Sequence, residues 1–114
     1  MKSIKAFIRT SKVDDVVTAL ESAKAPGITV SRVHGVGYGY DPYLFGLAPR
    51  ELARTPKVAK IEVVCADEDL DRLVQTISDS ARTGSRGDGI LFVTPIERAV
   101  RIRTGEEGEA VLRA

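Results

Sequence analysis

The sequence predicts an α+β fold of the ferredoxin-like type, a βαββαβ domain in which two helices cover one face of an antiparallel sheet. Stretches of alternating or β-branched residues and two stretches of helical periodicity follow one another in that order. A long irregular stretch separates the second strand from the third, as in a hairpin with an extended loop. With 114 residues, the chain has room for one domain, residues 1–114, and one core.

The first strand is predicted from the alternation of Ile4, Ala6 and Ile8 with polar neighbours, which is typical of a strand with one buried face. A helix is expected next. It would begin with a capping-box-like start at residues 11–14 and end before Gly27. Its apolar residues recur at helical spacing: Val13, Val16, Val17 and Leu20.

The second strand is predicted at residues 28–33, where it runs into the glycine-rich sequence GVGYGY. Residues 37–55 show neither the strand period nor the helical period and are expected to form a long loop, which in a compact domain is usually functional or mobile. Residues 57–65 are strongly β-like and should pair with the second strand across that loop.

The second helix is predicted from a buried stripe at helical spacing, with Asp67 as its cap and Gly84 ending it. A fourth strand is expected at residues 90–94, and residues 100–103 are expected to be extended. Because the strands carry apolar residues on both sides, the sheet face away from the helices needs cover, and self-association in a closed ring is the simplest one. The stripe consists of Leu70, Leu73, Val74, Ile77 and Ala81.

The composition narrows the possible functions. The net charge of +1 lacks the basic excess that a nucleic-acid-binding protein uses to attract phosphates. No apolar run approaches the length of a membrane span and no signal peptide is evident, so we expect a cytoplasmic protein without membrane insertion. Cys65 is expected to be a buried hydrophobe, and with His34 as the only histidine no metal site is implied.

A local phosphate-binding surface is predicted near the C-terminus. Gly84, Gly87 and Gly89 allow a tight turn that approaches a ligand closely, and Asp88 would supply an acceptor at its apex. Taken alone, such a turn is also an ordinary hairpin sequence. On a strand, Arg101 and Arg103 would leave the same face and could grip one set of phosphate oxygens, although paired arginines are more often a solvated face.

The chain resembles the P-II signal-transduction family over nearly its whole length, as an atypical member. The most specific matches are ARTGSRGDGILFV at residues 81–93 and RIRTGEEGEA at residues 101–110, supported by KVDDVVTALESA, GITVSRVHGVGYG and KIEVVC. The resemblance implies a homotrimer that binds an adenine nucleotide, ATP, ADP or AMP, in each cleft between subunits. It names a T-loop at about residues 37–55, a B-loop at about 82–89 and a C-terminal segment at about 101–114.

The resemblance also implies roles for individual residues. Thr29 and Val64 would line the adenine pocket, with the backbone near Glu62 reading the base edge, and Gly35 and Gly37 would let the T-loop base approach the phosphates. The B-loop would surround phosphates and ribose, while the two arginines would reach the phosphates from the neighbouring subunit. The remaining nucleotide-binding candidates are Tyr38, Gly87, Asp88, Gly89, Ile90, Arg101 and Arg103.

Departures from the family pattern change the expected ligands. Ile90 stands where most members have a lysine that grips the distal phosphates, so ADP or AMP should compete better against ATP than in typical members. Gly39 replaces the glutamine that helps to hold magnesium and 2-oxoglutarate, and Val58 replaces the lysine that pairs with 2-oxoglutarate. The classical 2-oxoglutarate response is therefore expected to be lost, and a small anion such as bicarbonate is an alternative effector.

The expected role is regulatory. The T-loop aromatics Tyr40, Tyr43 and Phe45 are candidates for contacting an unidentified protein target, such as an enzyme, a transporter or a regulator of nitrogen or carbon metabolism. Two rival hypotheses are a nucleotide-hydrolysing enzyme, for which no base or metal cage is evident, and a structural trimer like the related copper-tolerance fold. We therefore expect no catalytic residues.

Overall fold

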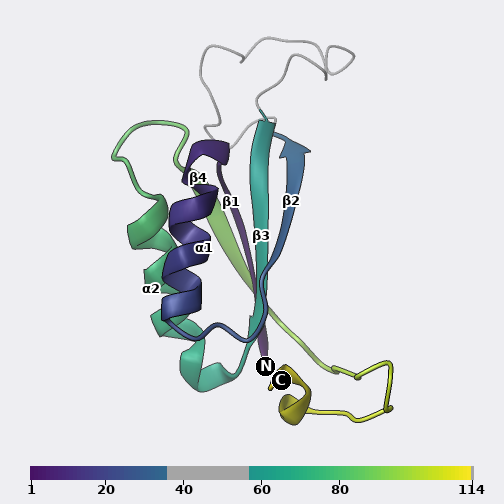
Figure 1. Ribbon diagram of the computed structural model, residues 1–114. Coiled ribbons are helices and arrows are strands. Elements are labelled where there is room, and N and C mark those ends of the chain that lie inside the picture. The colour runs from purple at the N-terminus through teal and green to yellow at the C-terminus, as the bar shows by residue number, and fades with distance from the viewer. Residues whose placement is uncertain (36–56, 114) are drawn as a thin grey trace.

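The computed structural model describes residues 1–35 and 57–113 of the chain. Four strands and two α-helices follow one another in the predicted order, connected in part by short 3-10 turns (Figure 1). The T-loop at residues 37–55 lies outside the described residues. The elements are β1 (Lys2–Arg9), α1 (Val13–Ser22), β2 (Thr29–His34), β3 (Lys57–Cys65), α2 (Leu70–Ala81) and β4 (Gly89–Pro95).

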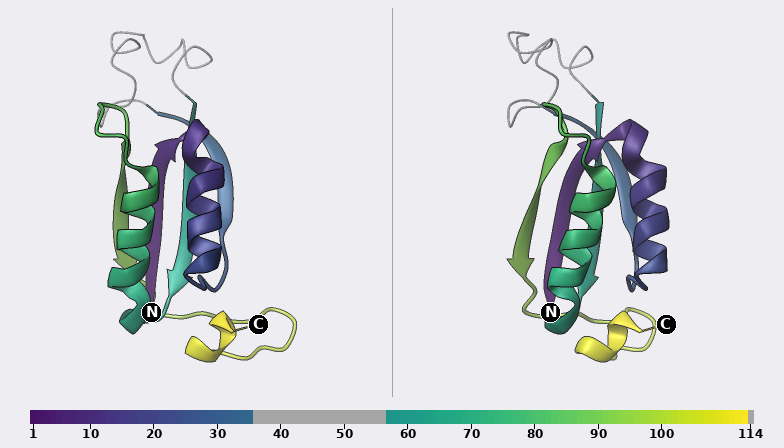
Figure 2. Two further views of the ribbon diagram at one scale, coloured as in Figure 1. Left: turned by 60° about the vertical axis from the view of Figure 1, so that its left-hand side comes forward. Right: turned by 90° about the vertical axis from the view of Figure 1, so that its left-hand side faces the viewer.

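The four strands form one antiparallel sheet in the order β2-β3-β1-β4. At its centre Ala6 of β1 lies opposite Ile61 of β3 and Leu91 of β4. Both helices pack on the same face of the sheet (Figures 1 and 2). The ferredoxin-like prediction is therefore confirmed, including the antiparallel pairing of β2 with β3 across the T-loop.

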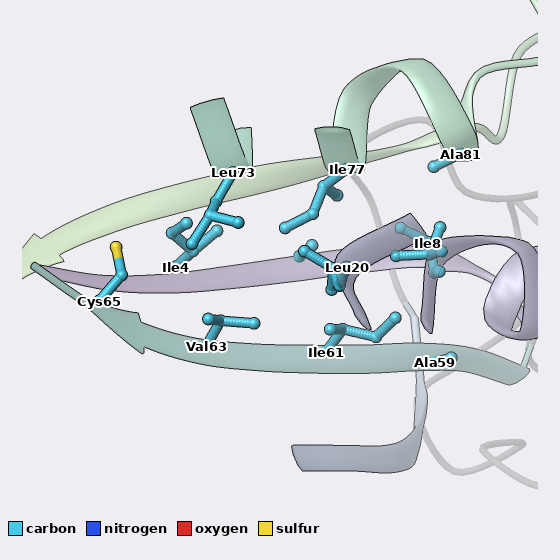
Figure 3. Close-up of a cluster of buried hydrophobic side chains, with 12 residues drawn as sticks. Ile4, Ile8, Leu20, Ala59, Ile61, Val63, Cys65, Leu73, Ile77 and Ala81 are labelled. Carbon is cyan, nitrogen blue, oxygen red and sulfur yellow. The ribbon is translucent and has the colours of Figure 1, made fainter. Parts of the chain in front are cut away.

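The core lies between the helices and the sheet (Figure 3). Alternate residues of the two central strands, among them Ile4 and Ile61, meet the buried stripes of both helices, represented by Leu20 and Leu73, and all four are fully buried. Burying one such side chain contributes about 1.5–3 kcal/mol. Cys65 closes the cluster at the end of β3, where burial raises the pKa of its thiol, as expected for a small core hydrophobe.

The face of the sheet away from the helices carries the other set of alternate residues. Phe7 and Phe92 meet there edge to face, with ring centroids 6.2 Å apart and an interplanar angle of 74°. Phe92 and Ile90 remain 41% and 38% exposed in a single chain, which confirms that the strands are apolar on both sides.

The predicted helix starts are wrong in detail. Residues 10–12 form a 3-10 turn before α1, which begins at Val13 without a side-chain cap. Asp67 belongs to a second 3-10 turn, Asp67–Asp69, and does not cap α2. Its carboxylate lies 3.0 Å from the N-terminal ammonium, and this hydrogen bond and positive charge lower the pKa of Asp67. At both sites the chain reverses from a strand directly into a helix, and a 3-10 turn is tighter than an α-helical first turn.

The predicted extended segment at residues 100–103 is also wrong. Val100 forms a single bridge with Glu107, and the chain between them folds into a turn in which the Thr104 and Gly105 amides donate to the carbonyl of Arg101. Gly105 has a φ of +74°, a conformation that favours glycine, and it makes this turn possible. Arg101 and Arg103 are therefore not paired on one face of a strand.

Candidate functional site

The B-loop, residues 82–89, is organised around the carboxylate of Asp88. One oxygen accepts hydrogen bonds from the backbone amides of Thr83 and Gly84, both at 2.8 Å. The other accepts the Thr83 hydroxyl and the Nε of Arg9, the latter at 3.2 Å. One side chain thus gathers four donors from the loop and from the end of β1.

These donors stabilise the ionised carboxylate. The Thr83 hydroxyl is the main cause that holds the pKa of Asp88 well below its ordinary value, against the opposing effect of burial; the amides of Thr83 and Gly84 and the Arg9 guanidinium add to it. The sequence suggested that Asp88 offers an acceptor to a ligand at the apex of the turn. In the structure both carboxylate oxygens accept hydrogen bonds from donors of the same chain, so Asp88 shapes the loop, and its contact with a ligand stays a prediction.

Arg9 contacts the B-loop from the end of β1, and the sequence reasoning missed it. Besides its bond to Asp88, its Nη2 donates to the carbonyl of Arg86. A Cβ added at Gly87 would lie 3.0 Å from that same Nη2, so the guanidinium packs against the glycine backbone. The alternation of the first strand marked Arg9 only as an outward polar residue. Its true neighbours are 77 and 79 positions away in the sequence.

The glycine-rich turn has the geometry expected from the sequence. Gly87 and Gly89 adopt φ angles of +96° and +105°, which side chains rarely tolerate. At Gly89 the backbone also approaches β1 so closely that a Cβ would lie 1.8 Å from the carbonyl oxygen of Phe7. A cavity of about 210 Å³ lies beside the turn, between the end of α2 and β4, and Asp88 and Gly89 contribute to its lining.

A second, separate cavity of about 300 Å³ lies at the edge of the sheet, and we call it the edge cavity. It brings together Thr29, Glu62 and Val64, the three residues that the resemblance assigns to an adenine pocket. Thr29 of β2 and Glu62 of β3 are directly opposite in the strand register. The Glu62 carboxylate is also paired with the Lys60 ammonium at 3.0 Å. The other lining residues are Pro26, Gly27, Val111 and Leu112.

Arg101 holds the outer wall of the edge cavity in place. Its Nη2 donates to the carbonyl oxygens of Val111 and Arg113, at 3.2 and 2.7 Å. These residues belong to or directly follow the 3-10 turn Glu109–Leu112, which places Val111 and Leu112 against the cavity. Arg103 lies exposed in the turn described above. Arg101 thus acts within its own chain in this structure, whereas the sequence suggested a phosphate contact.

The B-loop and the C-terminal segment lie at opposite ends of the sheet (Figures 1 and 2). The edge cavity opens at β2 and β3, whereas the B-loop leads into β4 on the far edge. Three inter-strand spacings, about 14 Å, separate the outer strands. The B-loop and the C-terminal arginines of the same copy are therefore separated both across the sheet and along its strands.

The remaining candidates are placed as follows. Ile90 lies opposite Phe7 in the register of β4 and β1, on the sheet face away from the helices. Val58 pairs with Arg9 of β1 and is 4% exposed. Gly35 is buried at the end of β2. Gly37, Tyr38, Gly39, Tyr40, Tyr43 and Phe45 fall on residues that the structure does not describe.

Neither a metal-ligand cluster nor a membrane-spanning helix is found within the described residues. In residues 1–35 and 57–113, no group of three or more His, Cys, Asp or Glu side chains could hold a metal ion. Over the same ranges, no helix has the length and apolar character needed to cross a bilayer.

Comparison with known proteins identifies the family. The family model for nitrogen regulatory protein P-II matches residues 1–106. Nitrogen regulatory protein P-II 2 of Methanothermobacter thermautotrophicus is 42% identical to this chain, over 96% of the chain and 95% of the relative. The P-II protein of Cereibacter sphaeroides is 43% identical, over 96% and 97%. That of Azospirillum brasilense is 44% identical, over 95% and 96%.

These matches span the β1 strand, both helices, the B-loop and the arginines of the C-terminal segment. They agree with the ferredoxin-like sheet and with the glycine-rich turn that precedes β4. The chain therefore belongs to the nitrogen regulatory P-II family of signal-transduction proteins.

Proposed function

We propose that this chain forms a homotrimer that binds an adenine nucleotide between neighbouring copies and reports its occupancy to a protein target through the T-loop. The observation that carries the proposal is the edge cavity, in which Thr29, Glu62 and Val64 converge from two strands. Its position far from the B-loop supports a site shared between copies, in which one copy supplies the cavity and another supplies further phosphate contacts. A role in regulation, without catalysis, is part of the same proposal.

The edge cavity has the chemistry of a base-binding pocket. Val64, Val111 and Leu112 provide apolar walls for an aromatic ring, while Thr29 and the β3 backbone near Glu62 provide hydrogen-bonding groups at its rim. The Lys60 ammonium balances the negative charge of the Glu62 carboxylate, so the ligand would not face an unpaired carboxylate. An adenine ring presents both donors and acceptors along its edge and suits this combination.

The phosphates would be met by the B-loop and the arginines. The bonds of Asp88 hold the B-loop in shape before any ligand arrives, so binding need not order it. Arg103 is exposed and ready to reach a phosphate of a neighbouring copy. Arg101 must first release the carbonyls of Val111 and Arg113. Phosphate contact by Arg101 would thereby loosen the wall of the edge cavity in its own copy.

The nucleotide preference follows from missing charges near the B-loop. Ile90 brings an apolar side chain next to Phe7 at the start of β4, where a cation could grip a third phosphate. Losing one charge-assisted contact weakens binding by about 1.5–3 kcal/mol. We therefore propose that ADP or AMP is favoured here relative to typical members. The buried Val58 offers no charge to a dicarboxylate, which supports loss of the 2-oxoglutarate response.

Calorimetric titration with ATP, ADP and AMP tests the proposal, each nucleotide being added with and without 2-oxoglutarate or bicarbonate. We expect ADP binding near one site per copy, weakened by Thr29→Val, and no enhancement of ATP binding by 2-oxoglutarate. A clear enhancement by 2-oxoglutarate would contradict the loss of that response. Enhancement by bicarbonate would identify the alternative effector. Steady release of ADP from ATP would contradict a purely regulatory role.

A further inference from the structure

We propose that Arg9 is the positioning residue of the B-loop, setting the place at which the loop meets the phosphates of the bound nucleotide. This inference rests on the proposed nucleotide site and adds a residue to it. It is carried by the double attachment of one guanidinium group, to the Asp88 carboxylate and to the Arg86 carbonyl.

The attachment joins two elements that are distant in sequence. Arg9 is the last residue of β1, and its side chain, 33% exposed, reaches the loop that connects α2 to β4. Within the loop, the Asp88 carboxylate accepts hydrogen bonds from Thr83 and Gly84, which precede it in the sequence. Those bonds fix the internal shape of the loop. Arg9 instead fixes the loop to the sheet.

The planar guanidinium is suited to this task. It donates from Nε and Nη2 at a fixed separation, so the carboxylate and the carbonyl are held in a fixed relation to each other and to β1. A lysine carries the same charge on one rotatable ammonium and has no rigid fork. Substitution of Arg9 by lysine therefore keeps the positive charge and removes the rigid geometry, so the two effects can be measured separately.

Gly87 shows how closely the loop and Arg9 fit. The side of Gly87 on which a Cβ would stand is occupied by the guanidinium, with Nη2 at 3.0 Å and Cζ at 3.4 Å. Glycine at this position therefore leaves the space that the Arg9 guanidinium occupies, in addition to any space that a ligand needs. A shift of Arg9 would move Gly87, the residue directly before Asp88 in the B-loop.

The test compares ADP with adenosine, which shares the base and ribose but lacks phosphates. We expect Arg9→Met to weaken ADP binding by about tenfold, the equivalent of one misplaced charge-assisted contact between the B-loop and a phosphate, and to leave adenosine binding unchanged. Arg9→Lys should remain well below the wild-type affinity for ADP. Hydrogen exchange at the Thr83 and Gly84 amides, which bond Asp88, should accelerate in Arg9→Met.

Arg72→Met is a matched control. Arg72 also bonds one carboxylate, Asp69 at 2.9 Å, and one carbonyl, that of Ala23, but at the start of α2. The Arg72→Met variant should leave amide exchange in the B-loop at the wild-type rate. Equal acceleration in both variants would show a general loss of stability and would overturn the assignment.

The outcomes distinguish Arg9 from the nucleotide site itself. If wild-type protein binds ADP and Arg9→Met binds it equally well, or loses ADP and adenosine affinity in parallel, Arg9 does not position the phosphates. Full recovery of ADP affinity in Arg9→Lys would assign a role of charge alone. If the wild-type protein binds no ADP, the nucleotide proposal fails and the role of Arg9 toward phosphate fails with it.

Discussion

Replacing Gly89 by alanine should destabilise the fold strongly, because the new Cβ has no space. It would lie 1.8 Å from the carbonyl oxygen of Phe7 and 2.9 Å from its carbonyl carbon, which are backbone atoms of the neighbouring strand. The φ angle of +105° adds conformational strain. Strain of this kind costs about 1–3 kcal/mol and overpacking typically another 1–3 kcal/mol, so we expect a loss of about 2–6 kcal/mol.

Gly84→Ala separates the two contributions. Gly84 has a similar φ of +89°, but no atom beyond Gly84 and its two chain neighbours lies within 4 Å of the point that a Cβ would occupy, so only the strain of about 1–3 kcal/mol should remain. Urea unfolding of both variants and the wild type, at one protein concentration, measures the difference. If Gly89→Ala were within 1 kcal/mol of Gly84→Ala, by the roughly 1 kcal/mol lower bound for overpacking, the close approach of β4 to β1 would not have the cost inferred here.

Three further substitutions test the site. Ile90→Lys should raise ATP affinity by about tenfold and AMP affinity much less, because it restores one charge near the distal phosphates; equal calorimetric gains for both nucleotides would contradict this. Asp88 has a lowered pKa, so its stabilisation is complete above its ordinary pKa of about 3.9 and is lost as the pH falls below it; the melting temperature of Asp88→Asn should therefore fall less steeply than that of the wild type between about pH 5 and 3. Arg101→Met should accelerate proteolysis within the C-terminal 3-10 turn while changing global stability by less than about 3 kcal/mol, because two hydrogen bonds of up to about 1.5 kcal/mol each are lost; an unchanged cleavage rate would show that Arg101 does not hold this wall.

The elements of the fold were predictable because their signals are local. The alternation in β1 and the helical stripe of α2 each depend on residues within a few positions of one another. The prediction for the segment around Arg101 was wrong because Arg-Ile-Arg alternates like a strand, although the Thr104-Gly105 pair that follows favours a turn. The predicted helix caps were wrong because the chain reverses tightly between strand and helix through 3-10 turns, and no local pattern indicates that reversal.

The candidate site was predictable only in part. The structure brings Thr29, Glu62 and Val64 together at one cavity, and their contact with an adenine ring stays a prediction. The contacts of Arg9 with the B-loop depend on strand register and on side-chain direction, and no local pattern encodes an interaction across 79 positions. For the same reason, the donors that Asp88 meets within the protein could not be foreseen, and its contact with a ligand stays a prediction.

If neighbouring copies share one nucleotide as proposed, the placement of the B-loop and the C-terminal segment at opposite ends of one sheet would link ligand binding to protein concentration. A nucleotide held by two copies at once is free to leave whenever the copies separate, and it stabilises the assembly by the free energy of its own binding. On dilution, ADP should therefore keep the protein associated at concentrations at which the unliganded chains come apart. The proposed sensor would then respond to its own abundance in the cell as well as to the nucleotide.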